Sequence, residues 1–167
     1  QYYIYELTYT GSDDTDKKSS SSDDDEATAM YTITGKAMSN FTPSSDKTIT
    51  YSTQFSTNYL FYANGGNLYR YNTSSGDNTL LYSAPDGYTI TLVKPRSYDA
   101  GTFTADLGRY LVLALSDGNG NGAVAEVYLN TSADVESILP SATTVYKGFG
   151  NILDLQFVHE YNYTTQE

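Results

Sequence analysis

The feature that most constrains the fold of this chain is a two-residue alternation of large apolar side chains with small or polar ones. Residues 1–9 show it clearly, because every second side chain from Tyr3 to Tyr9 falls on one face of an extended chain. Aromatic and β-branched residues in this period favour strands, and no stretch has a convincing helical period. We therefore predict an all-β, antiparallel fold. The expected strands lie near residues 1–9, 28–35, 48–55, 58–63, 67–72, 79–83, 88–94, 109–116, 123–130, 143–147 and 151–161.

Turn chemistry marks two hairpins. The sequence NGGN at residues 64–67 joins the runs 59–63 and 68–72, and SDGNGNG at residues 116–122 joins the runs 110–115 and 123–129. Asn and Gly tolerate the positive φ that tight hairpin loops require. Each hairpin has an alternating run before it and a short run after it, so a four-stranded unit occurs twice.

Four-stranded units in tandem are typical of β-propeller blades. We expect residues 1–47 to contain the end of a preceding blade, and residues 48–87 and 88–150 to form one blade each. Residues 151–167 would be the first strand of a further or ring-closing blade, followed by a tail. Such a set of blades cannot close a ring, so the rest of a longer parent chain would supply the others. The irregular spacing of the two units keeps a β-sandwich as the alternative.

The composition narrows the classes of function. The chain has 167 residues, with 20 Asp and Glu against 9 Lys and Arg, and a formal net charge of −11. This acidity repels the phosphates of nucleic acids and anionic lipids, so we expect no nucleic-acid partner. The chain has no Cys and one histidine, His159, which excludes thiol catalysis and multi-His metal sites. We expect no catalytic residues in this chain, and we expect it to act outside the cytoplasm.

Residues 11–26, GSDDTDKKSSSSDDDE, form a low-complexity segment. This segment has no aromatic side chain and almost no apolar one, so burial cannot offset the entropy lost on ordering it. We predict a disordered acidic loop between two strands.

A family resemblance appears in the second half of the chain. The segment YKGFGNILDLQF at residues 146–157 resembles the closing segment of the PKD-like surface lipoproteins of Bacteroidetes. The hairpin NLYRYN and the segment YLVLALSDGNGNGAVAEVYLN are similar to elements of the same family, and the resemblance covers residues 48–161. It implies a lipoprotein anchored in the bacterial outer membrane, with a propeller-like C-terminal part, often encoded beside nutrient-uptake systems. The lipidated Cys of such a protein is absent from this chain, and the acidic insertion 11–26 has no counterpart expected in the family.

One loop resembles half of a calcium site. Asp117, Asn119 and Asn121 stand at positions 1, 3 and 5 of a calcium loop, and Gly122 stands at position 6. Position 12 is Tyr128, which cannot supply the bidentate carboxylate of such a loop. Asp117, Asn119 and Asn121 are therefore candidate calcium ligands, and a plain hairpin turn is the alternative. We expect no other cofactor.

The candidate binding residues are Tyr69, Arg70 and Tyr71 in the first hairpin. Tyrosine offers a large, rigid, amphipathic contact surface, and Arg70 is the one basic residue in this hairpin. The alternative is that the 18 tyrosines act as strand formers that pack between sheets. Asp154 lies beside an alternating face, and we expect it to bond to the Gly148–Gly150 turn.

These patterns predict a non-catalytic interaction domain of a bacterial cell-surface lipoprotein. Its ligand would be a glycan, a peptide or a partner in an outer-membrane uptake complex. Two alternatives remain. One is a fragment of a propeller enzyme, such as a glycan-active hydrolase completed by upstream blades, and the other is a structural spacer or adhesin module.

Overall fold

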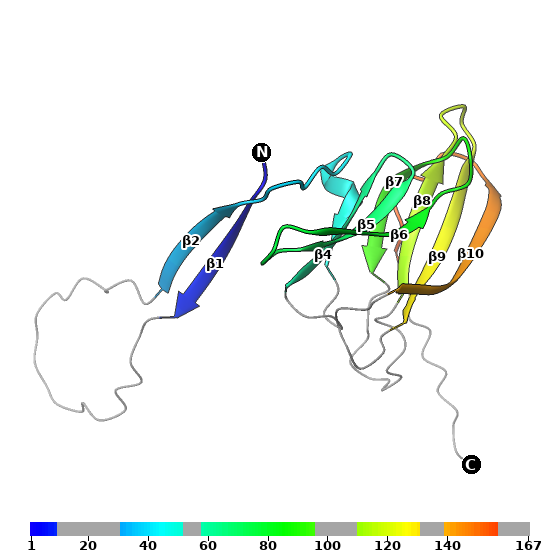
Figure 1. Ribbon diagram of the computed structural model, residues 1–167. Helices are drawn as coiled ribbons and strands as arrows, with labels where there is room; N and C mark the ends of the chain where they lie inside the picture. The colour runs from blue at the N-terminus through cyan, green and yellow to red at the C-terminus, as the bar shows by residue number, and fades with distance from the viewer. Residues whose placement is uncertain (10–30, 52–57, 96–109, 131–138, 157–167) are drawn as a thin grey trace, which may run out of the picture. The chain divides into compact units, whose positions relative to one another are not determined.

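The computed structural model describes residues 1–9, 31–51, 58–95, 110–130 and 139–156 (Figure 1). The prediction of an all-β, antiparallel fold is confirmed, with one two-stranded sheet and two four-stranded sheets. The chain divides into two compact units, residues 1–39 and residues 40–167. Within the described residues, no helix has the length and apolar character needed to cross a membrane.

The first unit is a hairpin of β1 (Tyr3–Tyr9) and β2 (Tyr31–Ala37). The two strands pair from Tyr3 opposite Ala37 to Tyr9 opposite Tyr31 without a bulge. Because directly paired residues share a face, the tyrosines of both strands lie together. The predicted acidic loop, residues 11–26, lies outside the described residues.

The second unit begins with a four-stranded sheet whose spatial order is its chain order. A 3₁₀ turn, η1 (Asp46–Thr48), leads into β3 (Ile49–Thr50), β4 (Tyr59–Asn64), β5 (Asn67–Asn72) and β6 (Asn78–Ser83). The predicted NGGN turn joins β4 to β5, and Gly65 there has a φ of 57°. The sheet falls within the predicted blade of residues 48–87.

The second four-stranded sheet repeats this order. Its strands are β7 (Thr89–Pro95), β8 (Tyr110–Ser116), β9 (Gly122–Asn130) and β10 (Leu139–Phe149). They fall within the predicted blade of residues 88–150, although β10 is longer than the expected strand 143–147.

The two four-stranded sheets lie beside each other (Figure 1), and they share one hydrophobic core. The side chains that fill it are fully or almost fully buried and come from both sheets; among them are Phe61, Ala63, Leu68, Leu81, Ile90, Val93, Leu111, Leu113, Leu115, Ala125 and Val127. Two consecutive antiparallel meanders that pack face to face fit both a pair of neighbouring propeller blades and a small sandwich. None of the sheets closes on itself within the described parts of the chain.

One contact recurs at the end of each hairpin and supports the repeat. Gly66, in the turn just before β5, lies against the carbonyl oxygen of Tyr88, just before β7. Gly122, at the start of β9, lies against the carbonyl oxygen of Gly150, just after β10. In both sheets, the chain that follows the fourth strand therefore passes beside a glycine of the central hairpin. Residues 151–156 follow Gly150 as extended chain that is not part of a strand, and the rest of the predicted strand 151–161, with His159, lies outside the described residues.

The segment before η1 belongs to the second unit and not to the hairpin, so the predicted range 1–47 is divided between two units. Phe41 is buried and packs against the rings of Tyr62 and Tyr71, with centroids 4.6 and 5.0 Å away. The N–H of Ser44 donates to the carbonyl of Ala63 at 2.9 Å. This segment therefore covers the outer face of the first four-stranded sheet.

Candidate functional site

A pocket of about 640 Å³ lies where the first strands of the two sheets meet the segment that follows β10. Its apolar lining comes from three separate parts of the chain: Ile49, Leu92, Val93, Pro95 and Leu153. Its polar lining comes from the same three parts: Asp46, Lys47, Thr50, Lys94 and Asp154. A pocket of this volume is within the range that binds small ligands in other proteins.

A bulge in β7 decides which face of the strand carries Lys94. Ile90 pairs with Leu115, but the register shifts before Leu92, which pairs with Ala114. The shift moves Leu92 and Lys94 to the face opposite Ile90 and Val93, which lie in the core. Without the bulge, strict alternation would place Lys94 on the core face.

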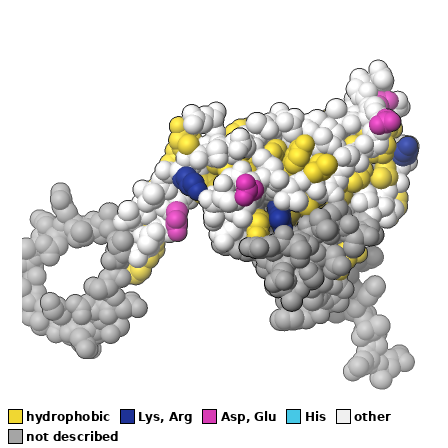
Figure 2. Space-filling view, viewed as in Figure 1, with side chains coloured by type: hydrophobic (Ala, Val, Ile, Leu, Met, Phe, Trp, Pro, Cys, Tyr) yellow, Lys and Arg dark blue, Asp and Glu magenta, His cyan; other side chains and the backbone are white. Residues whose placement is uncertain are grey.

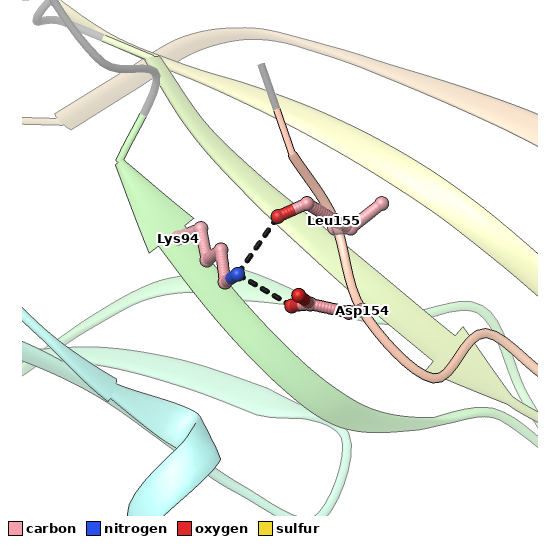
Figure 3. Close-up of polar contacts among 3 residues, drawn as sticks. All are labelled: Lys94, Asp154 and Leu155. Carbon is pink, nitrogen blue, oxygen red and sulfur yellow. Dashed lines mark hydrogen bonds and ion pairs between the residues drawn. The ribbon is translucent and has the colours of Figure 1, made fainter.

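Lys94 holds the segment after β10 against β7. Its Nζ donates to the carboxylate of Asp154 and, at 2.8 Å, to the carbonyl oxygen of Leu155 (Figure 3). The hydrogen bond from Lys94, followed by the backbone N–H of Leu155, lowers the pKa of Asp154 below its ordinary value. Because both side chains are partly exposed, this ion pair adds little to the stability of the fold. Its main effect is to hold Asp154 and Leu155 beside β7. We expected Asp154 to bond to the Gly148–Gly150 turn, whereas its partners here are Lys94 and its own neighbours.

The 3₁₀ turn η1 places the other two charges at the pocket. The hydroxyl of Thr48 donates to the carbonyl of Ser45 at 2.7 Å and accepts from the N–H of Ser45 at 3.1 Å. This pair of bonds closes the turn on itself, and Thr48, which is buried at 1% exposure, packs the turn against the sheets. Asp46 and Lys47 remain exposed on the anchored turn.

The charges of the lining balance, although the chain as a whole is strongly acidic. Lys47 and Lys94 stand against Asp46 and Asp154, whereas the chain has a net charge of −11. Figure 2 shows that charged side chains are sparse among the described residues of the visible face, where apolar and neutral side chains predominate. The pocket therefore suits a ligand without a large net charge.

The predicted binding residues of the first hairpin are mostly inside the protein. Arg70 is 8% exposed, its guanidinium lies 4.7 Å from the ring centroid of Tyr59, and it donates to the hydroxyl of Thr79 at 3.3 Å. Tyr71 is 2% exposed, beneath Phe41. Tyr69 is half-buried and stacks on Tyr62, with centroids 5.4 Å apart. A binding role for this hairpin therefore depends on Tyr69.

The predicted calcium loop is organised by hydrogen bonds to Asp117. Its Oδ1 accepts from the N–H groups of Asn119 and Asn121, at 2.8 and 3.0 Å, and its Oδ2 accepts from the Asn121 side chain at 2.7 Å. These bonds lower the pKa of Asp117, the one from the Asn121 side chain most. A bound cation would have to compete with them. Across the described ranges, no three His, Cys, Asp or Glu residues are grouped closely enough to hold a metal ion.

Sequence reasoning did not identify the pocket. Lys94, Asp46 and Lys47 are ordinary charged residues in sequence, and the pocket exists only because three distant segments meet. The one local indication of the pocket is Pro95, which follows Lys94 at the end of an alternating run. Proline restricts a strand to the edge of its sheet, and the pocket lies at that edge.

Comparison with known protein families, with curated proteins and with solved structures finds no match to this chain. The fold and the pocket define an all-β protein with two four-stranded sheets and a largely apolar pocket whose charged side chains balance.

Proposed function

We propose that this chain is a non-catalytic binding domain of a bacterial cell-surface lipoprotein, and that its pocket receives a short peptide segment of a partner. The observation that supports this proposal is the pocket itself, with five apolar side chains and two pairs of opposite charges. An uptake complex in the outer membrane is a setting in which such a partner would occur.

A peptide suits this lining better than a glycan does. Apolar peptide side chains would be buried against Leu92 and Leu153, and charges of either sign would find a partner at Lys47 or Asp46. Sites that bind sugars commonly include an aromatic ring on which the sugar stacks, and none of the described lining residues is aromatic. The balanced charge also favours a peptide over a polyanion.

Two observations favour binding over catalysis. The acidic groups of the pocket, Asp46 and Asp154, are exposed, and the pKa of Asp154 is lowered rather than raised. A general acid at neutral pH needs a raised pKa, so Asp154 is suited to remain a charged carboxylate.

The bacterial surface setting is supported by the resemblance of residues 146–157 and of the two hairpins to PKD-like lipoproteins. The acidity of the chain agrees with that setting.

The experiment is a screen of the intact protein against a random peptide library and a glycan array. Leu153→Asp is the test variant, because Leu153 lines the pocket and is 81% exposed, so its replacement leaves the core intact. Leu80→Asp is the matched control, since Leu80 is also an exposed leucine but lies on β6, outside the pocket lining. We expect peptide binding that Leu153→Asp weakens at least tenfold and Leu80→Asp leaves unchanged. Failure to bind any peptide, or equal binding by both variants, would contradict the proposal.

A further inference from the structure

The hairpin of the first unit has one strongly apolar face. Six large side chains share it, each between 50% and 65% exposed: Tyr3, Tyr5, Leu7, Tyr9, Tyr31 and Ile33. The opposite face carries mostly polar side chains, with the pairs Glu6–Thr34 and Thr8–Thr32. An isolated two-stranded hairpin is only marginally stable in water, so this face needs a covering partner.

The aromatic rings on this face are already arranged by contacts within the hairpin. The rings of Tyr3 and Tyr5 stack with centroids 6.3 Å apart, and Tyr9 and Tyr31 lie 5.3 Å apart. Tyr5 lies across Gly35, where a Cβ would come within 2.9 Å of its ring. Gly35 therefore lets the ring lie flat on the sheet, which leaves a level surface for a partner.

We propose that the partner is a second copy of this chain, docked through the same face in a two-fold dimer. The centre of the face is the directly paired Leu7 and Ile33, and aliphatic side chains need a dry, apolar contact. A sugar hydroxyl placed over them would lose its hydrogen bonds to water, which disfavours a glycan as the occupant. A second apolar hairpin face meets this need fully.

The size of the face fits a dimer. Four half-exposed tyrosines and two aliphatic side chains expose roughly 700 Å² per copy, and burial of most of this area reaches the lower end, roughly 600 Å² per partner, of stable protein interfaces. The contact is isologous, because each copy contributes the same surface.

Charge and shape select one orientation for the two copies. The described part of the hairpin has one acid, Glu6, and one base, Lys36, and both lie on the other face. The acidic run of residues 11–26 belongs to the sequence that joins Tyr9 to Tyr31. A stack in which the strands of the two copies run antiparallel places the Tyr9 and Tyr31 ends of the two hairpins, to which the acidic sequence is joined, at opposite ends of the dimer. It also sets the bulky Tyr31 of one copy opposite the small Ala37 of the other, and Leu7 opposite Tyr5.

The first test measures the molecular mass of the intact chain by sedimentation velocity across a micromolar concentration series. Ile33→Lys introduces a charge at the centre of the face, and Thr32→Lys introduces the same charge at the adjacent position on the opposite face. We expect the unaltered chain and Thr32→Lys to form dimers, and the dissociation constant of Ile33→Lys to rise at least about thirtyfold. A monomeric unaltered chain, or equal dimerisation of the two variants, would overturn the proposal.

A second test remains decisive if Ile33→Lys unfolds the hairpin. The chain has no cysteine, so Leu7→Cys introduces a single thiol on the apolar face, and Thr8→Cys introduces one on the opposite face. Stacked sheets lie about 10 Å apart, too far for a direct disulfide, so the cross-linker is a bis-maleimide with a flexible spacer. It should link Leu7→Cys into a dimer and leave Thr8→Cys mostly monomeric. Equal cross-linking of the two variants, or none in Leu7→Cys, would show that the face does not meet a second copy. A monomer in which hydroxyl radicals fail to modify Tyr3 and Tyr5 would show that the same chain covers the face, which also overturns the dimer.

Discussion

The recurring glycine contact gives the sharpest test of the repeated architecture, because Gly66 and Gly122 both lie near the start of the third strand of their sheets but differ in the space that a Cβ would have. An alanine Cβ at position 122 would overlap the carbonyl oxygen of Gly150 and lie 3.2 Å from Cγ1 of Ile152. At position 66 the Cβ would lie 3.0 Å from the carbonyl oxygen of Tyr88 and 3.7 Å from the Cβ of Ala84. Gly122→Ala therefore forces the chain after β10 away from β9, and Gly66→Ala requires a shift of a few tenths of an ångström.

The magnitudes follow from two opposing effects. Overpacking against a backbone atom costs about 1–3 kcal/mol, because a carbonyl cannot rotate away as a flexible side chain can. Replacement of glycine also stabilises the fold by about 0.4–1 kcal/mol, since alanine restricts the unfolded chain. For Gly122→Ala we expect a net loss of about 2 kcal/mol in the free energy of unfolding. For Gly66→Ala the two effects nearly cancel, and we expect a change within about 0.5 kcal/mol.

The assay is equilibrium unfolding in urea, followed by far-UV circular dichroism and tyrosine fluorescence. A loss of about 2 kcal/mol lowers the urea midpoint by about 1 M for a protein of this size. Hydrogen exchange should also speed up in residues 151–156 of Gly122→Ala, because their contact with the hairpin is lost. Equal midpoints for Gly66→Ala and Gly122→Ala would refute the reasoning, since they would show that Gly150 does not lie against Gly122.

Three further predictions follow from single side chains. Leu113→Ala should lower the free energy of unfolding by about 3–4 kcal/mol, because Leu113 is fully buried between the sheets. Leu153→Ala should change it by less than about 0.5 kcal/mol, because Leu153 is exposed. Urea unfolding measures both changes. Arg70→Lys should destabilise the fold by about 1–2 kcal/mol in the same assay, because an ammonium group cannot both cover the Tyr59 ring and reach Thr79 as the planar guanidinium does. The pKa of Asp117 is lowered on folding, so its stabilising effect is present above its unfolded pKa and is lost as the pH falls through its folded pKa. Melting temperatures between about pH 5 and pH 2 should therefore fall more steeply for the unaltered chain than for Asp117→Asn, and parallel curves would contradict this reading.

The strands could be predicted from sequence because alternation and turn residues are local properties. The strand expected at residues 67–72 matches β5, since NGGN and the alternating Tyr69 and Tyr71 specify both its start and its register. The end of the second sheet was harder to predict. β10 begins at Leu139, four residues before the expected strand, and a bulge between Pro140 and Ala142 interrupts its alternation.

The candidate site could not be predicted in the same way, because burial of a strand depends on what covers its two faces. Tyr69, Arg70 and Tyr71 look like an exposed aromatic run in sequence. In the structure β5 is a central strand, with Arg70 against Tyr59 on one face and Tyr71 beneath Phe41 on the other. Phe41 stands 30 residues earlier in the chain, so no local pattern indicates this cover.

The pocket has a similar non-local origin. It depends on the bulge that turns Lys94 away from the core, and on a segment about 60 residues later that supplies Asp154 and Leu153. A bulge between Ile90 and Leu92 leaves no mark in an alternating sequence, because Ile90, Leu92 and Val93 are all apolar.

The most direct test of the proposed binding site is an NMR titration of the ¹⁵N-labelled chain with a peptide selected from the library. If the peptide binds in the pocket, the largest amide shifts will fall on Thr50, Lys94 and Leu153, and Leu153→Asp will abolish them. If the largest shifts instead fall around Tyr69, or spread over the whole chain, the pocket does not bind the peptide and the proposed function is wrong.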